Sequence, residues 1–321
     1  MPEGYTHIRT AQRAARAIHY KVKCPEAFAA GANGPDLLFG FEAWKPAAKR
    51  RSDLPALGRR MHEERTGAFL QSLLRHVHTL PQVEYALGFV AHYATDTVLH
   101  PYVEAVCQPG LSYAQKGGHA YFEIALDSVL HAEDTGVAVV PADEAGPVPV
   151  GEVMADIATM LCACLQEVYS VEVTVEELAD AFYQTNRIRR LLAGRGRLTS
   201  GLLWLVEPLF GGRGAVTGHI SPRQLATDLP DDWTDPFTGE ARQGNAFALL
   251  REAQTRCEQM LSATLQYWMR VLPEAELAQK LGSMSYIEGR ATERSALLAV
   301  SETPDPAAEP ETQPDEKEIT V

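Results

Sequence analysis

The sequence lacks several features that would assign it to a class of protein at once. It has no run of 18 apolar residues, so no membrane-spanning helix is expected. Basic residues are scarce: 29 Lys and Arg stand against 42 Asp and Glu, and the net charge of −13 argues against binding of nucleic acid through a basic surface. The five cysteines are scattered and odd in number, which is typical of reduced thiols rather than of a disulfide framework.

Common catalytic motifs are absent as well. The chain contains no HExxH, GxSxG or GxxxxGK[ST] motif, and no adjacent His-Asp pair of the kind used by HD-type phosphohydrolases. The segment from Met1 to His7 has neither the basic nor the apolar part of a secretory signal, so we expect a cytoplasmic protein. Hydrophobic residues make up 45% and charged residues 22%, which excludes disorder of the whole chain.

Helical periodicity runs through most of the sequence, and convincing β patterns are missing. Ile8, Ala11, Ala15, Ile18 and Val22 predict a first helix, with Thr6 as its N-cap. Thr174 and Glu177 predict a capping box, and residues 211–244 predict a long surface loop. Further helices are expected at about 57–80, 81–100, 118–132, 152–170, 174–193, 199–210, 245–271 and 274–281. The predicted class is therefore all-α, a compact multi-helix bundle.

The last twenty residues differ from the rest in composition. From Glu302 to Val321 there are seven acids, one base and four prolines, and almost no apolar residues. Such a segment buries too little surface to offset the entropy of ordering. We therefore expect one helical domain over residues 1–300 and a disordered acidic tail over 301–321.

Acidic residues and histidines recur at helical spacing in the first 130 residues. His92, Asp96 and His100 are four apart, which places them on one helix face, and Pro101 predicts that the helix bends or ends there and turns His100 toward a different point. His119 and Glu123 form a second pair at the same spacing, able to hold one metal ion. Burying such groups is costly unless they are paired or bind a cation.

Three more candidates lie upstream. Asp36 follows Asn33-Gly34-Pro35 in a turn-forming sequence, and His7 lies in the first turn of the first helix. His62 is the candidate on the second helix, where His76 and His78 compete for its role but have apolar neighbours in sequence.

In order and context these residues resemble the zinc-dependent phospholipase C family, whose all-α fold is shared with the N-terminal domain of clostridial alpha-toxin and, more remotely, with single-strand-specific zinc nucleases. The family's ligands follow the order of an early His, an Asp in a Pro-Asp turn, a His, a His-x3-Asp with a further His, and a His-x3-Glu. This chain is similar over about residues 4–130, and more weakly to about 270. The matching residues are His7, Asp36, His62, His92, Asp96, His100, His119 and Glu123.

The resemblance implies a division of these residues among metal ions. Asp36, His62 and His92 would hold one zinc, which Asp96 would bridge to a second zinc that also takes His7. The remaining three, His100, His119 and Glu123, would hold a third. In secreted members the processed N-terminal residue completes the second site; here Glu3 is a candidate. The domain would then comprise a metal-site half at about 1–135 and a packing half at about 150–300.

The resemblance further implies hydrolysis of a phosphodiester bond, in a phospholipid or a related phosphate ester, by metal-bound hydroxide, because zinc lowers the pKa of bound water to about 7. Asp36 would also act as the catalytic base that orients the water. Two alternatives stay open: an inactive metal-binding scaffold of the same fold, and a zinc nuclease. We expect no nucleic-acid partner and at most transient contact with a membrane surface. A candidate for such contact is the basic run at the end of a predicted helix, which is otherwise expected to be a solvated face: Arg187, Arg189, Arg190, Arg195 and Arg197. The sequence specifies no oligomeric state.

Overall fold

The fold is mainly helical, as the sequence predicts. The computed structural model describes residues 4–194, 201, 203, 205, 207 and 217–298. Within these residues the only sheet is a hairpin of β1 (Asp232–Thr234) and β2 (Ala241–Gln243), in which Trp233 pairs with Arg242. The α-helices are α1 (Gly4–Ala17), α2 (Pro25–Gly31), α3 (Leu54–Glu63), α4 (Thr66–Arg75), α5 (Leu80–Val106), α6 (Gly118–Thr135), α7 (Ala142–Ala145), α8 (Gly151–Tyr169), α9 (Val175–Leu192), α11 (Ala246–Trp268) and α12 (Glu274–Leu281).

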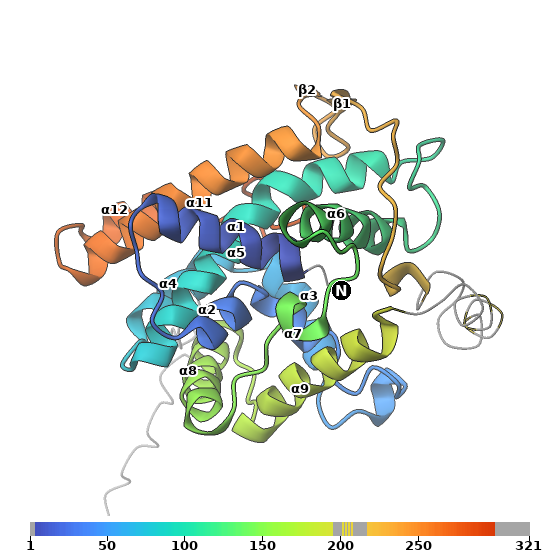
Figure 1. Cartoon of the computed structure of the whole chain (residues 1–321). Helices are drawn as coiled ribbons and strands as arrows, with labels where there is room; N and C mark the ends of the chain where they lie inside the picture. Colours follow the sequence, from blue (N-terminus) through green and yellow to red (C-terminus); the bar gives the residue numbers. More distant parts are fainter. Residues whose placement is uncertain are drawn as a thin grey trace, which may run out of the picture.

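The long helix α5 forms the centre of the molecule. It begins with a capping box, in which the Thr79 side chain accepts from the Gln82 backbone and the Gln82 side chain accepts from the Thr79 backbone. Almost all of its residues are buried, because α1, α2, α4, α6, α8 and α11 all pack against it. In Figure 1, α11 runs along α5 across the top of the molecule while α8 and α9 lie at the bottom.

Two glycines let α2 and α5 approach closely. A Cβ on Gly88 would lie 2.1 Å from the carbonyl oxygen of Phe28, and one on Gly31 would lie 2.0 Å from the carbonyl oxygen of Tyr85. Any side chain at either position would push the two backbones apart. The turn after α2, which carries Asp36, is thereby held against α5.

The apolar core consists of two clusters that meet along α5. One cluster contains the N-terminal half of this helix, including Tyr85 and Phe89, together with residues from α2, α4, α8 and α9. The other contains Val98, Tyr102 and Val106 with residues from α6 and the start of α11. His92, Asp96 and His100 belong to neither cluster. They form a buried polar seam along the part of α5 where the two clusters meet.

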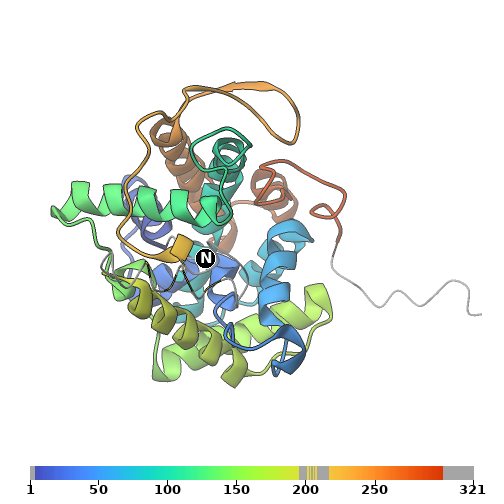
Figure 2. The ribbon, with the colours of Figure 1, turned by 90° about the vertical axis from the view of Figure 1, so that its right-hand side faces the viewer.

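Several expected boundaries are wrong. The single helix expected over 57–80 is divided into α3 and α4, because Glu64 is extended and Arg65 adopts a left-handed conformation with φ of 52°. Arg65 donates its backbone N–H to the carbonyl of Arg294, so a distant segment holds this break open. The region expected to be only loop, 211–244, contains the hairpin, which Figure 2 shows at the edge opposite α8 and α9.

Two further corrections concern α1 and α5. Thr6 lies inside α1, where its hydroxyl donates to Asp127, so it is not the N-cap, and α1 ends at Ala17 rather than near Val22. Pro101 does not end α5, which continues to Val106. A proline inside a helix costs about 3 kcal/mol, and burial of the residues that follow it in the second cluster offsets that cost.

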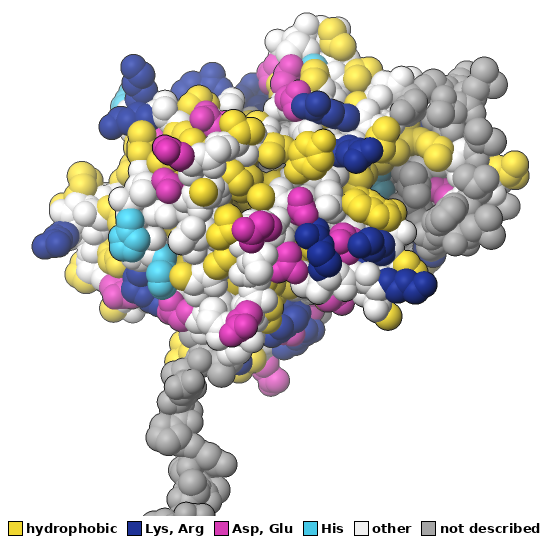
Figure 3. Space-filling view, turned by 90° about the horizontal axis from the view of Figure 1, so that it is seen from below, with side chains coloured by type: hydrophobic (Ala, Val, Ile, Leu, Met, Phe, Trp, Pro, Cys, Tyr) yellow, Lys and Arg dark blue, Asp and Glu magenta, His cyan; other side chains and the backbone are white. Residues whose placement is uncertain are grey.

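Two short helices, α2 and α7, were not expected from the sequence, whereas α6, α8, α9, α11 and α12 lie where helices were expected. The capping box of Thr174 and Glu177 starts α9, and α12 has the bounds expected. The helix expected at 199–210 lies largely outside the described residues, as do Arg195, Arg197 and the expected tail over 301–321. The face seen in Figure 3 mixes acidic, basic and apolar side chains without a stripe of one charge.

The close approach of α2 and α5 gives a prediction on stability. Replacing Gly88 with Ala should lower the free energy of unfolding by about 2 to 3 kcal/mol, because the added Cβ overlaps the Phe28 carbonyl. Gly136→Ala is the control: its φ of 82° is left-handed, but nothing lies within 4 Å of the added carbon, so the cost should be about 1 kcal/mol. Urea unfolding of both variants checks this; equal losses would contradict the close contact.

Candidate metal centre

Asp96 lies at the centre of the polar seam with only 1% of its surface exposed. Its Oδ1 atom is 3.2 Å from Nε2 of His7 and 3.5 Å from Nε2 of His100. Its Oδ2 atom is 3.0 Å from Nε2 of His92 and 3.8 Å from Nε2 of His62. Four imidazoles from α1, α3 and α5 therefore surround one carboxylate.

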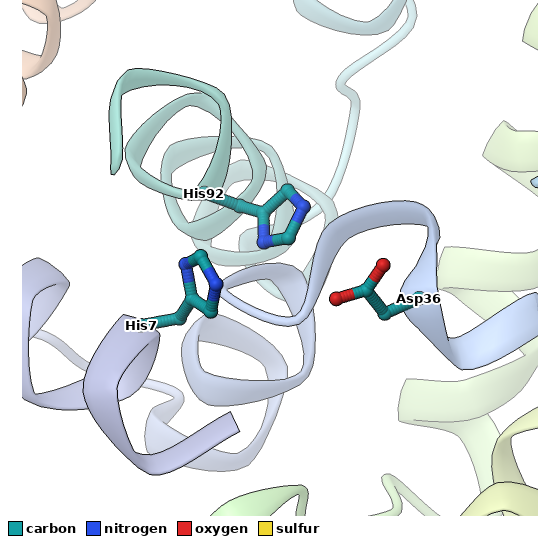
Figure 4. A group of neighbouring side chains, drawn as sticks. All are labelled: His7, Asp36 and His92. Atoms are coloured by element: carbon teal, nitrogen blue, oxygen red, sulfur yellow. The ribbon is translucent and has the colours of Figure 1, made fainter. Parts of the chain in front are cut away.

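The eight candidate residues gather into three groups of metal-ligand type, two of which share His92. The donor atoms within each group lie within 4.8 Å of one another. Figure 4 shows three of these side chains, from α1, from the turn after α2 and from α5, converging on one point. The groups are His7, Asp36 and His92; His62, His92 and Asp96; and His100, His119 and Glu123.

Backbone carbonyls orient two of the imidazoles. Nδ1 of His62 lies 2.7 Å from the carbonyl oxygen of Gly58, and Nδ1 of His92 lies 3.2 Å from that of Ala32. A neutral imidazole that donates Nδ1–H to a carbonyl keeps a lone pair on Nε2, which is the arrangement usual for metal-ligating histidines. In both residues Nε2 is the atom that faces the carboxylates.

Several polar atoms of the candidate ligands lack hydrogen bonds among the described residues. Asp96 Oδ2 and His92 Nε2 face each other at 3.0 Å, yet neither has a hydrogen-bond partner among the described residues, and the same holds for Nδ1 of His7 and of His100. Such orphaned buried atoms are costly. Nitrogen and oxygen ligands bound to one tetrahedral zinc lie about 3.3 Å apart, so a zinc ion fits these donors in kind and in spacing.

The charge states of the carboxylates suit cation binding. Burial alone would raise the pKa of Asp36, Asp96 and Glu123, but neighbouring imidazoles outweigh burial and hold each of these pKa values below its ordinary range. Burial lowers the pKa of His7 to about 4, which favours the neutral form that binds metals. Burial also opposes the charged form of His119, yet Glu123 and Glu104 raise its pKa well above 6.5.

Contacts between imidazoles and carboxylates hold the third group, His100, His119 and Glu123, in place. His100 Nε2 and His119 Nε2 each lie 3.2 Å from the same oxygen of Glu123. Nδ1 of His119 lies 2.7 Å from Glu104, one turn beyond His100 on α5. Sequence reasoning missed Glu104, although its spacing of four from His100 was a signal that could have found it.

The turn that carries Asp36 depends on a buried arginine. Arg189 of α9 is 5% exposed, and its guanidinium donates to the side chain of Asn33 at 2.7 Å. This contradicts the expectation that Arg189 belongs to a solvated basic face. Gly34 follows Asn33 with φ of 51°, and a Cβ there would lie 2.1 Å from the imidazole of His92, so glycine lets the turn pass over that ring.

A second buried carboxylate positions α1. Asp127 of α6 accepts hydrogen bonds from the backbone N–H groups of Tyr5 and Thr6 and from the Thr6 hydroxyl, at the N-terminus of the helix that carries His7. Burial raises the pKa of Asp127 to about 6. Its spacing of four from Glu123 places it on the same face of α6, but nothing local indicated that it would reach α1.

A cavity of about 170 Å³ opens onto the seam. It is lined by Asp36, Phe39, Arg59, His62, Glu63, His100, His119, Glu123 and Ile287. His7, His92 and Asp96 lie behind it. The segment after α12 covers the inner side, where the ring of Tyr286 packs at 5.1 Å from that of His62 and its backbone N–H donates to the His62 carbonyl.

The structure thus brings all eight candidate residues together, with one difference from the implied division. His100, His119 and Glu123 form a group of their own, as expected. The other five residues form one larger cluster, because His92 belongs both to the group with His7 and Asp36 and to the group with His62 and Asp96. The assignment of individual zinc ions stays a prediction, and Glu3 lies outside the described residues.

None of the helices described here is sufficiently long and apolar to span a membrane.

Comparisons with known proteins bear on this site. No curated protein and no solved structure matches the chain. The family model described as zinc dependent phospholipase C matches residues 6–189, from the residue before His7 to Arg189. Because that match covers more than half of the chain, the protein belongs to the zinc-dependent phospholipase C family.

Proposed function

We propose that this protein hydrolyses phosphodiester bonds with the help of bound zinc, cleaving a phospholipid or a related phosphate ester in the manner of a phospholipase C and releasing a phosphorylated head group. The observation that carries the proposal is a cavity lined by residues of all three ligand-type groups: Asp36 and His62 on one side, and His100, His119 and Glu123 on the other. A phosphoryl group in this cavity would be within reach of both.

The proposed zinc ligands are His7, Asp36, His62, His92, Asp96, His100, His119 and Glu123. When bound, zinc supplies Lewis-acid polarisation of phosphoryl oxygens and a water nucleophile near neutral pH. We expect at least two ions, with a third at His100, His119 and Glu123. Three carboxylates among eight ligands leave a site with two or three divalent ions net positive, which suits an anionic substrate even in an acidic protein.

Asp36 is the proposed catalytic carboxylate. It belongs to the group of His7, Asp36 and His92 and also lines the cavity, with 15% of its side chain exposed, whereas Asp96 is buried. Nε2 of His62 lies 3.1 Å from Asp36 Oδ1, and this contact helps to keep the pKa of Asp36 low. An anionic carboxylate at the cavity wall can orient a water molecule toward the phosphorus atom and accept its proton.

Metal content gives the first test. Full-length protein loaded with zinc and dialysed should contain at least two equivalents per chain by elemental analysis. The Glu123→Gln variant should lose about one equivalent, because the third group then lacks its carboxylate. His78→Ala is the matched control, since this histidine is exposed and belongs to none of the three groups. A folded protein that retains no zinc would exclude both catalysis by zinc and a metal-binding scaffold.

Removing the central charge gives the second test. Asp96→Asn replaces the buried carboxylate with a neutral amide and removes the negative charge that would hold the cations, so turnover of a diester should fall at least a thousandfold, about 4 kcal/mol. The matched control is Asp134→Asn, which changes a partly exposed carboxylate that pairs with Arg9 on the surface. Steady-state rates and zinc content of both variants check this. Undiminished turnover in Asp96→Asn would dismiss the proposed site.

A substrate panel separates the proposal from its alternatives. Zinc-loaded protein is assayed with phosphatidylcholine vesicles, a chromogenic phosphodiester and single-stranded DNA, with Asp96→Asn as the blank. Release of a phosphorylated head group or of the chromophore is the expected result. Cleavage of DNA alone would indicate a nuclease, and zinc binding without any cleavage would indicate a scaffold.

A further inference from the structure

Arg59 is a cation at the mouth of the metal cavity. It lies on α3, three residues before His62, so the two side chains share one face of that helix. Arg59 lines the cavity together with Phe39, Glu63 and Ile287. Its side chain is exposed, whereas that of His62 is buried. The Arg59 guanidinium therefore lies on the solvent-exposed side of the cavity, and His62, a proposed metal ligand on the same helix face, lies on its buried side.

The other charges on this side of α3 are already paired. Glu63 accepts from Nη1 of Arg294 at 2.6 Å, and Glu64 accepts from Arg60 at 3.1 Å and also from Arg294. The two carboxylates, of Glu63 and Glu64, are thus paired with Arg60 and Arg294, and Arg59 is the third arginine in this region. Within the described part of the chain, no acidic side chain pairs with Arg59, including Glu63, which is four residues away on the same helix. The Arg59 guanidinium is therefore left without a carboxylate partner among the described residues.

This charge is opposite in sign to the protein as a whole, whose net charge is −13. A guanidinium offers a planar fork of N–H donors that matches carboxylate and phosphate groups. The cavity of about 170 Å³ is smaller than the roughly 300 Å³ or more of a typical small-molecule pocket. It can enclose a phosphoryl group, while the substituent of that group must extend to the mouth, where Arg59 lies.

We propose that Arg59 is a specificity-determining residue, which binds an oxyanion on the substituent of the phosphoryl group at the mouth. The site then prefers phosphate esters whose substituent carries a carboxylate or a second phosphate, and disfavours those that carry a quaternary ammonium. The inference rests on the proposed function for the position of the phosphoryl group. The expected substrate class is therefore a phosphate ester with an anionic substituent.

Calorimetry with three phosphate monoesters of similar size tests this without any turnover. Ethyl phosphate has a neutral substituent, phosphoglycolate a carboxylate and phosphocholine a quaternary ammonium. Zinc-loaded wild-type protein should bind phosphoglycolate about tenfold more tightly than ethyl phosphate, an effect typical of one charge-assisted hydrogen bond, and phosphocholine no more tightly than ethyl phosphate. Arg59→Ala should remove the tenfold preference and leave ethyl phosphate within twofold.

Two further variants sharpen the result. Arg59→Lys keeps the charge but loses the fork, so it should retain part of the preference. Arg251→Ala removes an exposed arginine of α11 that does not line the cavity, and it should bind all three esters as the wild type does. Zinc content and thermal unfolding of each variant confirm that the site and the fold are intact.

The outcomes separate this inference from the proposed function. If Arg59→Ala weakens all three esters equally, or if the wild type prefers phosphocholine or binds none of the esters, the inference is wrong. If diesters are cleaved while the preference is absent, only the inference fails. If no diester is cleaved but the preference is present and depends on Arg59, the binding role stands and the proposed catalysis does not.

Discussion

Asp96 brings α1, α3 and α5 to one point in the core. A carboxylate that is 1% exposed costs several kcal/mol unless positive charge or hydrogen bonds compensate for its lost hydration. Here the compensation comes from four imidazoles at 3.0 to 3.8 Å. Those imidazoles are buried too, and some of their nitrogen atoms lack hydrogen-bond partners among the described residues, so the arrangement suits a cation. The surrounding helices therefore have to be fixed by contacts outside the seam.

Those outer contacts explain why so much of the chain is needed for a small site. Asp127 on α6 holds the start of α1, and Arg189 on α9 holds the turn that carries Asp36. The match to the family model ends at residue 189, so the matched region includes this arginine. Beyond it, Tyr286 packs against the ring of His62, and Ile287 lines the cavity. A later part of the chain can therefore alter access to the site without altering the ligands.

Local patterns were sufficient for most of the fold. Apolar spacing predicted the helices that became α6, α8, α9, α11 and α12, because each has one face buried against a neighbour. The errors arose where tertiary contacts outweigh local preference. The break at Arg65 depends on Arg294, and the continuation of α5 through Pro101 depends on the burial of the residues that follow. Neither partner is near in sequence.

The same distinction applies to the site. The group of His100, His119 and Glu123 was predictable as a unit, because two helical pairs at a spacing of four fix most of its geometry. The five remaining ligand candidates come from α1, the turn after α2, α3 and α5, and no local rule specifies how these elements meet. Their merging at His92 depends on contacts such as the Gly31 and Gly88 approach of α2 to α5. Residue types and order can thus propose a set of candidate ligands, whereas their division among ions depends on distances that only packing determines.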